Sequence, residues 1–491
     1  MRNPDVQALV YASFAPLRHC RYLLLRVTDA AAARRWLGQS AVLDLVRGGD
    51  GLRGDAVQGE VLAMAFTHAG LLAMGHTQHG DFPFPSAFQE GMNEPARART
   101  LADFEVEKWR WGDLQGTTVD ADGAARQQVH LLLAHFRSTP WDAQDAGPLG
   151  VAALQAHGLA LVEQVNTCPA YIQDSPEGLR VTEPFGFRDG LAQPVLASAA
   201  EVSRSHLARR ERVGADLAAD NVVADGEFVL GLPNVYGDPA YAPDDARWAA
   251  GRPPGAAQRF GVHGSYLVVR HIRQFAERFR DFEAEHPATE AGAPSLAEKM
   301  VGRRKDGSPL VTVPLPPKDP NAFRFRVNDA EGFQCPLGSH VRRANPRDSL
   351  GLDVPSGLAN AKLHRLIRRG RVYAGDCRQA PRGTCGHPDA QGTCGQGLFF
   401  LALNADLDRQ FEFVQQQWIA NARFADLANE SDPLLGGHGK RDFTVQAPAG
   451  GERVRKLPRF TETHGGGYFF LPGLAALRFL LGADERTGTA T

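Results

Sequence analysis

One histidine of this chain stands in an arginine-rich setting that could serve a cofactor. His340 is followed within seven positions by Arg342, Arg343 and Arg347, in the run HVRRANPR. A neutral imidazole can bind haem iron as an axial ligand, and arginines pair well with the carboxylates of an anionic cofactor. The same spacing also suits a histidine and arginines that serve only the surface or the core. His340 is therefore a candidate iron ligand, and Arg342 is a candidate partner of a cofactor carboxylate.

An acidic loop offers a second reactive group. Residues 183–194 read EPFGFRDGLAQP, so Asp189 lies between Gly186 and Gly190 in an otherwise apolar segment bounded by prolines. Flanking glycines let the backbone approach a flat ligand closely and let the carboxylate reach into a cavity. Asp-Gly is also a common turn dipeptide, so a plain tight turn is the alternative.

A third segment carries a cation near a predicted helix end. In residues 363–373 three apolar side chains have helical spacing, and Arg368 then precedes Gly370 by two positions. We expect a helix that stops at Gly370, with Arg368 in its last turn. Arg368 could serve that helix end, where the dipole favours a positive charge, or it could face a bound anion.

The apolar patterns of the chain indicate the elements that must position these groups. A buried-strand pattern followed by a helical pattern occurs twice in each half, at residues 21–37, 62–74, 264–282 and 398–418. Two such units are the content of a ferredoxin-like α+β domain, a β-sheet with helices packed on it. We therefore predict an α+β protein with two ferredoxin-like domains. Residues 1–220 would carry Asp189, and residues 221–491 would carry His340 and Arg368.

Taken together, the three segments resemble the dye-decolourising peroxidase family, in its larger bacterial and fungal-like type. Residues 186–190 (GFRDG) match the family's G-x-x-D-G motif, His340 its proximal histidine and Arg368 its distal arginine. Further similar segments follow in the family's order at residues 84–92, 226–237, 264–270 and 397–403. The resemblance runs from about residue 20 to about residue 475 and so covers nearly the whole chain.

The resemblance implies a haem peroxidase of the dimeric α+β barrel-like superfamily. One haem b (iron protoporphyrin IX) per chain would be held mainly by the second domain. His340 would be the axial ligand of the iron, Asp189 the acid–base catalyst, and Arg368 the cation that stabilises bound peroxide. Hydrogen peroxide would oxidise dyes, phenols and other aromatic reductants in one-electron steps through a ferryl intermediate. The residues expected to contact the cofactor besides His340 are Gly186, Phe187, Gly190 and Arg342.

Two further roles follow from the family's chemistry. An acceptor behind His340 should fix the tautomer of the imidazole, and the helical pattern after residue 405 offers Glu412 first, with Asp406 as the alternative. Electrons from bulky donors would be relayed by oxidisable aromatic side chains. The available candidates, which the sequence does not rank, are Trp109, Trp111, Trp248, Trp418, Tyr236 and Tyr373.

Other functions have weaker support. A non-enzymatic haem-binding or iron-releasing protein on the same scaffold would keep His340 but would not need both Asp189 and Arg368. The run HGGG at residues 464–467 resembles an oxyanion-hole motif of hydrolases, but no G-x-S-x-G accompanies it. A glycine-rich segment holds Cys377, Cys385, His387 and Cys394 without a C-x-x-C pair, and we expect a surface loop there rather than a zinc site.

Composition sets the remaining bounds. The chain has 491 residues, of which 43% are hydrophobic and 22% charged, as in an ordinary globular protein with room for two domains. A net charge of −2 gives no reason to expect nucleic acid as a partner. The sequence shows no signal-peptide pattern and no membrane-spanning run. We expect a cytoplasmic monomer or homodimer, with non-classical export left open.

Overall fold

The computed structural model describes residues 2–51, 59–113, 127–141, 147–175, 178–198, 220–251, 258–312, 320–321, 323–375, 394–437 and 441–483. Cys377, Cys385 and His387 of the glycine-rich segment lie outside these residues, as does most of the chain just before the expected boundary at residue 220. Within the described residues, no helix is long and apolar enough to cross a membrane.

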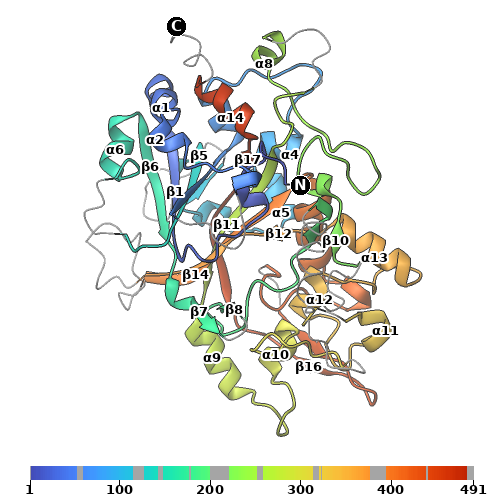
Figure 1. Cartoon of the computed structure of the whole chain (residues 1–491). Helices are drawn as coiled ribbons and strands as arrows, with labels where there is room; N and C mark the ends of the chain where they lie inside the picture. The colour runs from blue at the N-terminus through green and yellow to red at the C-terminus, as the bar shows by residue number, and fades with distance from the viewer. Residues whose placement is uncertain are drawn as a thin grey trace.

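A large, mainly antiparallel sheet is the frame of the fold (Figure 1). Its strands follow one another in the order β12-β14-β11-β17-β2-β5-β1-β6. Their bounds are β1 His19–Val27, β2 Glu60–Phe66, β5 Leu131–Arg137, β6 Leu159–Asn166, β11 Ser265–Gln274, β12 Ile367–Arg368, β14 Cys394–Asn404 and β17 Thr461–Leu471. The expected strands in both halves of the chain are thus present.

Burial on both faces explains why these apolar runs form strands. Successive side chains of a strand point to opposite faces of the sheet. In β1, Leu23 and Leu25 belong to one hydrophobic cluster, whereas Tyr22 and Leu24 belong to another. A continuous apolar run can therefore fill two cores at once, one on each side of the sheet.

The two halves of the chain meet within this one sheet. Strand β17 of the second half pairs with β2 of the first half through Phe470 and Phe66. The expected α+β class and ferredoxin-like organisation are confirmed. The sheets of the two halves are joined edge to edge rather than separate, and the division of the chain near residue 220 stays a prediction.

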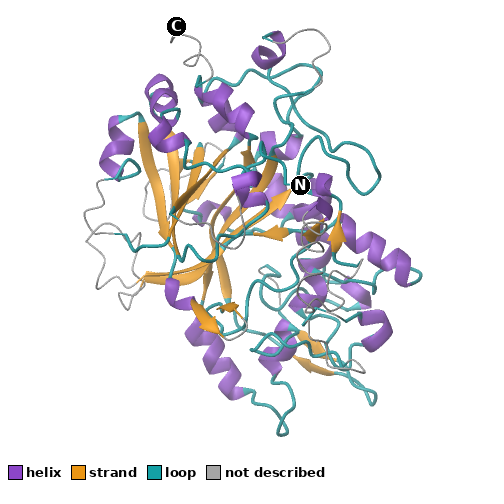
Figure 2. Cartoon of the chain, in the orientation of Figure 1, coloured by secondary structure: helices purple, strands orange, loops and turns teal. Residues whose placement is uncertain are grey.

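Helices cover the sheet at one end and build a second region at the other. Figure 1 places α1 (Ala30–Leu37), α2 (Ser40–Leu43) and α6 (Val151–Ala156) beside the blue and green strands of the first half. The yellow and orange helices of the second half gather on the opposite side, and Figure 2 shows many loops among them. They are α9 (Ala276–Glu285), α10 (Leu296–Val301), α11 (Phe325–Asp329), α12 (His340–Ala344) and α13 (Val354–Leu363). The remaining helices that bear labels in Figure 1 are α4 (Ser86–Glu90), α5 (Pro95–Thr100), α8 (Ala246–Ala250) and α14 (Leu474–Leu481).

The segment around Arg368 differs from its prediction. Helix α13 ends at Leu363, and Ile367 and Arg368 form the short strand β12 on the edge of β14. The predicted helix up to Gly370 is therefore wrong. Helical spacing of three apolar residues is a weak local preference, and pairing with the sheet edge supplies backbone hydrogen bonds that override it.

The helix expected at residues 407–418 is present in an unusual form. It consists of two π-helical stretches, η7 (Asp408–Glu412) and η8 (Val414–Ile419). A π-helix takes more residues per turn than an α-helix; it is rare and is frequently found at functional sites. Phe411, Val414 and Gln415 from these stretches line the cavity described next.

Candidate active site

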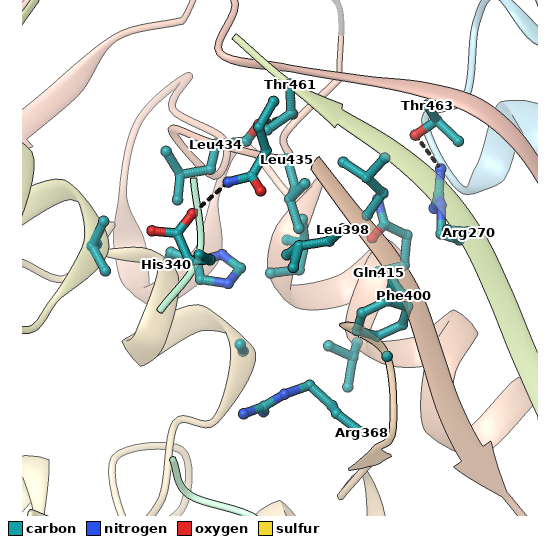
Figure 3. Close-up of a pocket in the computed structure, with 18 of the residues that line it drawn as sticks. Arg270, His340, Arg368, Leu398, Phe400, Gln415, Leu434, Leu435, Thr461 and Thr463 are labelled. Carbon is teal, nitrogen blue, oxygen red and sulfur yellow. Dashed lines mark hydrogen bonds between the residues drawn. The ribbon is translucent and has the colours of Figure 1, made fainter. Parts of the chain in front are cut away.

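A cavity of about 350 Å³ lies between the sheet and the helices of the second half. Its volume is within the range of small-molecule sites. His340, Asp189 and Arg368 all line it, so the structure brings together the three groups singled out in the sequence. Figure 3 shows His340 and Arg368 directed into the same open space from different elements, with Leu398, Phe400, Leu434 and Leu435 forming apolar walls.

His340 is held from behind by a buried carboxylate. The ring Nδ1 lies 2.9 Å from Oδ2 of Asp432, whose side chain is fully buried. The other carboxylate oxygen accepts the backbone N–H groups of Leu434 at 2.9 Å and Leu435 at 2.8 Å. Burial alone would raise the pKa of Asp432, but the attraction and hydrogen bond of His340, together with the charge of Arg343, hold that pKa below its ordinary value. An ionised Asp432 fixes the proton on Nδ1 and leaves Nε2 as the nitrogen available to a ligand.

Neither acid expected behind His340 is there. Glu412 accepts two hydrogen bonds from Arg97 Nη1, at 2.6 and 2.7 Å, and one from the hydroxyl of Tyr468 at 2.6 Å. Asp406 instead accepts the backbone N–H of Arg409 at 3.0 Å. The prediction of Glu412 or Asp406 is wrong because both acids have partners elsewhere, and Asp432 takes the role.

The arginines that follow His340 hold the backbone instead of facing a ligand. Arg342 is buried outside the cavity, where it donates to carbonyl oxygens of Asp329, Ala330 and Cys335 at 3.0 Å each. Arg343 likewise donates to carbonyl oxygens of Trp418, Asn421 and Glu430. The prediction that Arg342 contacts the cofactor is therefore wrong. A guanidinium can satisfy several carbonyls at once, and these two arginines anchor the loops around α12.

A different set of arginines faces the cavity, and sequence reasoning missed two of them. Arg303 and Arg365 are buried and line it together with Arg368. In the part of the chain that the structure describes, no carboxylate forms an ion pair with any of the three. Burial, with repulsion from neighbouring arginines that include Arg368, lowers the pKa of both Arg303 and Arg365 to about 9. Buried cations without counter-charges favour a bound anion.

The loop of Asp189 is shaped by its glycines. Gly186 has a φ of +91° and Gly190 a φ of +80°, values that side chains with a Cβ seldom adopt. The Gly190 N–H donates to Oδ1 of Asp189 at 2.6 Å, and the Asp189 N–H donates to the carbonyl of Val181 at 2.8 Å. Phe187 and Asp189 line the cavity, whereas Gly186 and Gly190 do not. The two glycines thus bend the loop, and contact with a cofactor through them stays untested.

Arg368 connects this loop to the edge of the sheet. Its Nη2 donates to the carbonyl of Leu191 at 2.7 Å, and its backbone N–H donates to Oε1 of Gln193 at 3.0 Å. Arg365 adds a hydrogen bond of 2.9 Å to the carbonyl of Ala192. The acidic loop of the first half and strand β12 of the second half are therefore tied together beside the cavity.

The aromatic candidates separate by exposure. Trp109 lines the cavity, and Tyr236 is 64% exposed. Trp109 itself is buried, and so are Trp111, Trp248, Trp418 and Tyr373. The HGGG run lies within β17 and therefore has the extended backbone of a strand rather than that of a hydrolase loop.

Comparison with known proteins finds similar peroxidases. No family model matches the chain. A multifunctional dye peroxidase of Amycolatopsis sp. is 28% identical over 487 residues, which cover 93% of this chain and 91% of the relative. A dye-decolorizing peroxidase of Auricularia auricula-judae is 27% identical over 444 residues, which cover 85% of this chain and 74% of the relative. The chain is thus similar, over most of its length, to dye-decolourising peroxidases of a bacterium and a fungus.

Solved structures of dye-decolourising peroxidases share the fold over almost the full length. The enzyme of Amycolatopsis sp. superimposes with a TM-score of 0.64 at 22% identity and covers 98% of this chain and 100% of its own. A fungal structure from Auricularia auricula-judae gives a TM-score of 0.69 at 23% identity and covers 98% of this chain and 99% of its own. A structure in complex with 2,6-dimethoxyphenol also gives 0.69, at 21% identity, and covers 97% of this chain and 98% of its own.

Dye-decolourising peroxidases are haem enzymes, and the cavity of this chain fits such a group. The face of His340 opposite Asp432 is directed into the cavity, so an unshared nitrogen is available for iron. Arg303 and Arg365 supply positive charge for carboxylates on a flat macrocycle. Leu398, Phe400 and Leu434 supply the apolar surface that its faces require.

Proposed function

We propose that this protein is a haem peroxidase that uses hydrogen peroxide to oxidise dyes, phenols and other aromatic donors in one-electron steps. The observation that carries the proposal is the shared cavity. An imidazole oriented by a buried carboxylate, an acid on a glycine-bounded loop and an uncompensated arginine all face one space. The names of the relatives agree with this reading, and one solved relative is described in complex with 2,6-dimethoxyphenol.

The cofactor that we propose is one haem b per chain, with His340 as its axial ligand. Asp432 would make the imidazole more electron-rich by accepting its Nδ1 proton. Arg303 and Arg365 would pair with the propionates. When bound, the haem would supply an iron centre that peroxide oxidises and that takes electrons from aromatic donors.

Asp189 and Arg368 would divide the work on peroxide between them. Oδ1 of Asp189 is occupied by the Gly190 N–H, which leaves Oδ2 to take a proton from peroxide and return it to the leaving oxygen. Arg368 carries a permanent charge beside the cavity and would stabilise the negative charge that develops on the leaving oxygen. A protein that only stored haem would need neither group at this place, so their joint presence favours catalysis.

The test is reconstitution of the purified protein with haemin. We expect wild type to develop a Soret band and to oxidise 2,6-dimethoxyphenol only when peroxide is added. His340→Ala should lose the axial-ligand spectrum and nearly all turnover. His286→Ala is the matched control, since this histidine caps the end of α9, where its ring bonds the carbonyl of Phe282, and it lies outside the cavity. A His340→Ala variant with the spectrum and turnover of wild type would refute the ligand assignment.

A further inference from the structure

The acid Glu183 begins the loop that carries Asp189, and its side chain folds back over that loop. Oε1 accepts the backbone N–H of Phe187 at 2.9 Å, and Oε2 accepts that of Phe185 at 3.0 Å. The backbone closes the same turn, because the Gly186 N–H donates to the Glu183 carbonyl at 2.8 Å and the Glu183 N–H donates to the Phe187 carbonyl at 3.0 Å. One carboxylate therefore holds two amides of the turn that leads to Asp189.

Gln274 ties this carboxylate to the sheet. Its Nε2 donates to Oε2 of Glu183 at 2.5 Å, and the residue is 5% exposed. Gln274 is the last residue of β11, a strand that lies between β14 and β17, and Gln274 itself is paired with Thr461 of β17. A strand held on both edges is among the most rigid places in a fold, so Gln274 offers the loop a fixed anchor.

The other ties of the loop act at different points. Phe185 stacks on Phe279 of α9, with ring centroids 4.2 Å apart. The Arg188 N–H donates to the Lys305 carbonyl at 3.0 Å. The link from Glu183 to Gln274 joins the start of the loop to β11, and both residues line the cavity. The hydrogen bonds of Arg368 in β12 act further along, at Leu191 and Gln193.

We propose that Glu183 and Gln274 are positioning residues that fix the loop through which Asp189 reaches the cavity. The role rests on the proposed peroxidase function of Asp189. Neither residue is assigned a proton transfer with peroxide. Acid–base catalysis is sensitive to misplacement of about 1 Å, so a loosened loop should slow the reaction even though Asp189 itself is unchanged.

The surroundings of Glu183 disfavour its ionised form, so the hydrogen bonds from the loop and from Gln274 must offset that cost. Burial, together with the like charge of Asp189, raises the pKa of Glu183 to about 7, although the hydrogen bonds from Phe185, Phe187 and Gln274 act to lower it. Burial, followed by the charges of Cys168 and Glu183, raises the pKa of the Tyr171 hydroxyl. The ammonium of Lys305, from the neighbouring hairpin, pairs with Glu283 at 2.5 Å instead.

Substitutions at Gln274 test the clamp without touching the acidic loop. Gln274→Met keeps the length of the side chain and removes the donor. Gln274→Glu places a second carboxyl beside that of Glu183. The two carboxyls can form a hydrogen bond only while one of them is protonated. Glu183→Gln changes the other partner, and Gln164→Met is the matched control because Gln164 lies on β6, outside the cavity.

The first measurement is hydrogen exchange of the peptide spanning residues 182–190, in the apo and haem-loaded protein. We expect exchange at least about tenfold faster in Gln274→Met and Glu183→Gln, and unchanged exchange in Gln164→Met. The second is the rate constant for reaction with hydrogen peroxide at matched haem occupancy. We expect it to fall about tenfold to a hundredfold in both variants. In Gln274→Glu the rate should approach wild type as the pH falls and should decline as the shared proton is lost.

Three results would overturn the proposal. The first is hydrogen exchange as slow as in wild type for Gln274→Met. The second is faster exchange with an unchanged rate constant for hydrogen peroxide. The third is a loss of that rate constant in Gln274→Glu that is the same at every pH. Failure of the proposed function looks different, since wild type itself would then not react with peroxide while the exchange measurement would still report the clamp. Because the variants lie on two elements, misfolding of one leaves the other as the test.

Discussion

Replacing Asp432 with asparagine is the sharpest test of how His340 is prepared for its ligand. The amide oxygen of the new side chain would keep the two backbone N–H groups that Oδ1 accepts now. Its NH2 group would then stand where Oδ2 accepts the His340 Nδ1 proton at 2.9 Å. Two donors would face each other, so the imidazole would have to move its proton to Nε2, the nitrogen needed for iron.

The size of the effect follows from the interaction that is lost. A hydrogen bond to a charged group contributes roughly 1.5–3 kcal/mol, and a loss of about 2 kcal/mol corresponds to about a 30-fold change in an equilibrium constant. We therefore expect the dissociation constant for haemin to rise about tenfold to a hundredfold in Asp432→Asn. The assay is titration of the apo protein with haemin, followed by the Soret absorbance.

A matched control separates this effect from the general cost of altering a buried acid. Asp442 is also buried and bonded, to Arg453 and to the backbone of Lys456, but it does not line the cavity. Asp442→Asn should bind haemin as wild type does. Wild-type affinity and spectrum in Asp432→Asn would refute the reasoning, because the imidazole would then not depend on its acceptor.

Three further perturbations have defined outcomes. Arg368→Leu should lower kcat/KM for hydrogen peroxide about a hundredfold to a thousandfold with haem content unchanged, and an unchanged value from stopped-flow kinetics would exclude its electrostatic role. Arg342→Met should lower the free energy of unfolding in urea by about 3–5 kcal/mol, since it leaves Asp329 buried without its cation, yet it should keep the haem stoichiometry of wild type. Burial raises the pKa of Asp113 to about 6. The folded protein therefore binds more protons than the unfolded chain between about pH 4 and pH 6, and the stability contributed at this site falls as the pH rises through that window. Urea unfolding across it should show this slope in wild type and a flatter curve in Asp113→Asn.

The frame of the fold could be predicted because its signals are local and redundant. Each of the strands β1, β2, β11 and β14 contains a run of consecutive apolar residues that is buried on both faces of the sheet. Asp29 caps α1 by accepting the Ala32 N–H at 3.0 Å, which is the start that a helix-capping residue predicts. The strand β12 was missed because its two residues have no pattern of their own and depend on a neighbour at the sheet edge.

The site was predictable only where a motif carries it. Asp189 and His340 stand in recognisable segments, but Asp432 lies 92 residues after its partner in a stretch that no spacing rule marks. Arg342 was expected to contact the cofactor because it follows His340 closely in the sequence. Closeness in sequence does not decide where the end of so long a side chain lies. Arg342 reaches carbonyl groups of a preceding loop, whereas Arg303 comes to the cavity from the hairpin after α10. Contacts of this kind are set by packing and cannot be read from neighbours in the chain.

Because η7 and η8 are π-helical, the number of residues in this segment matters for the shape of the cavity. Phe411, Val414 and Gln415 line the cavity from these wide turns. Removing one residue between positions 408 and 419 would favour an ordinary α-helix, which turns about 100° per residue instead of the smaller step of a π-helix, and would change the directions of the side chains within the segment. Val414 and Gln415 would then leave the cavity wall although no lining residue had been substituted. An engineer who reshapes this pocket can therefore exchange side chains along the segment, but shortening it would change which side chains the cofactor meets.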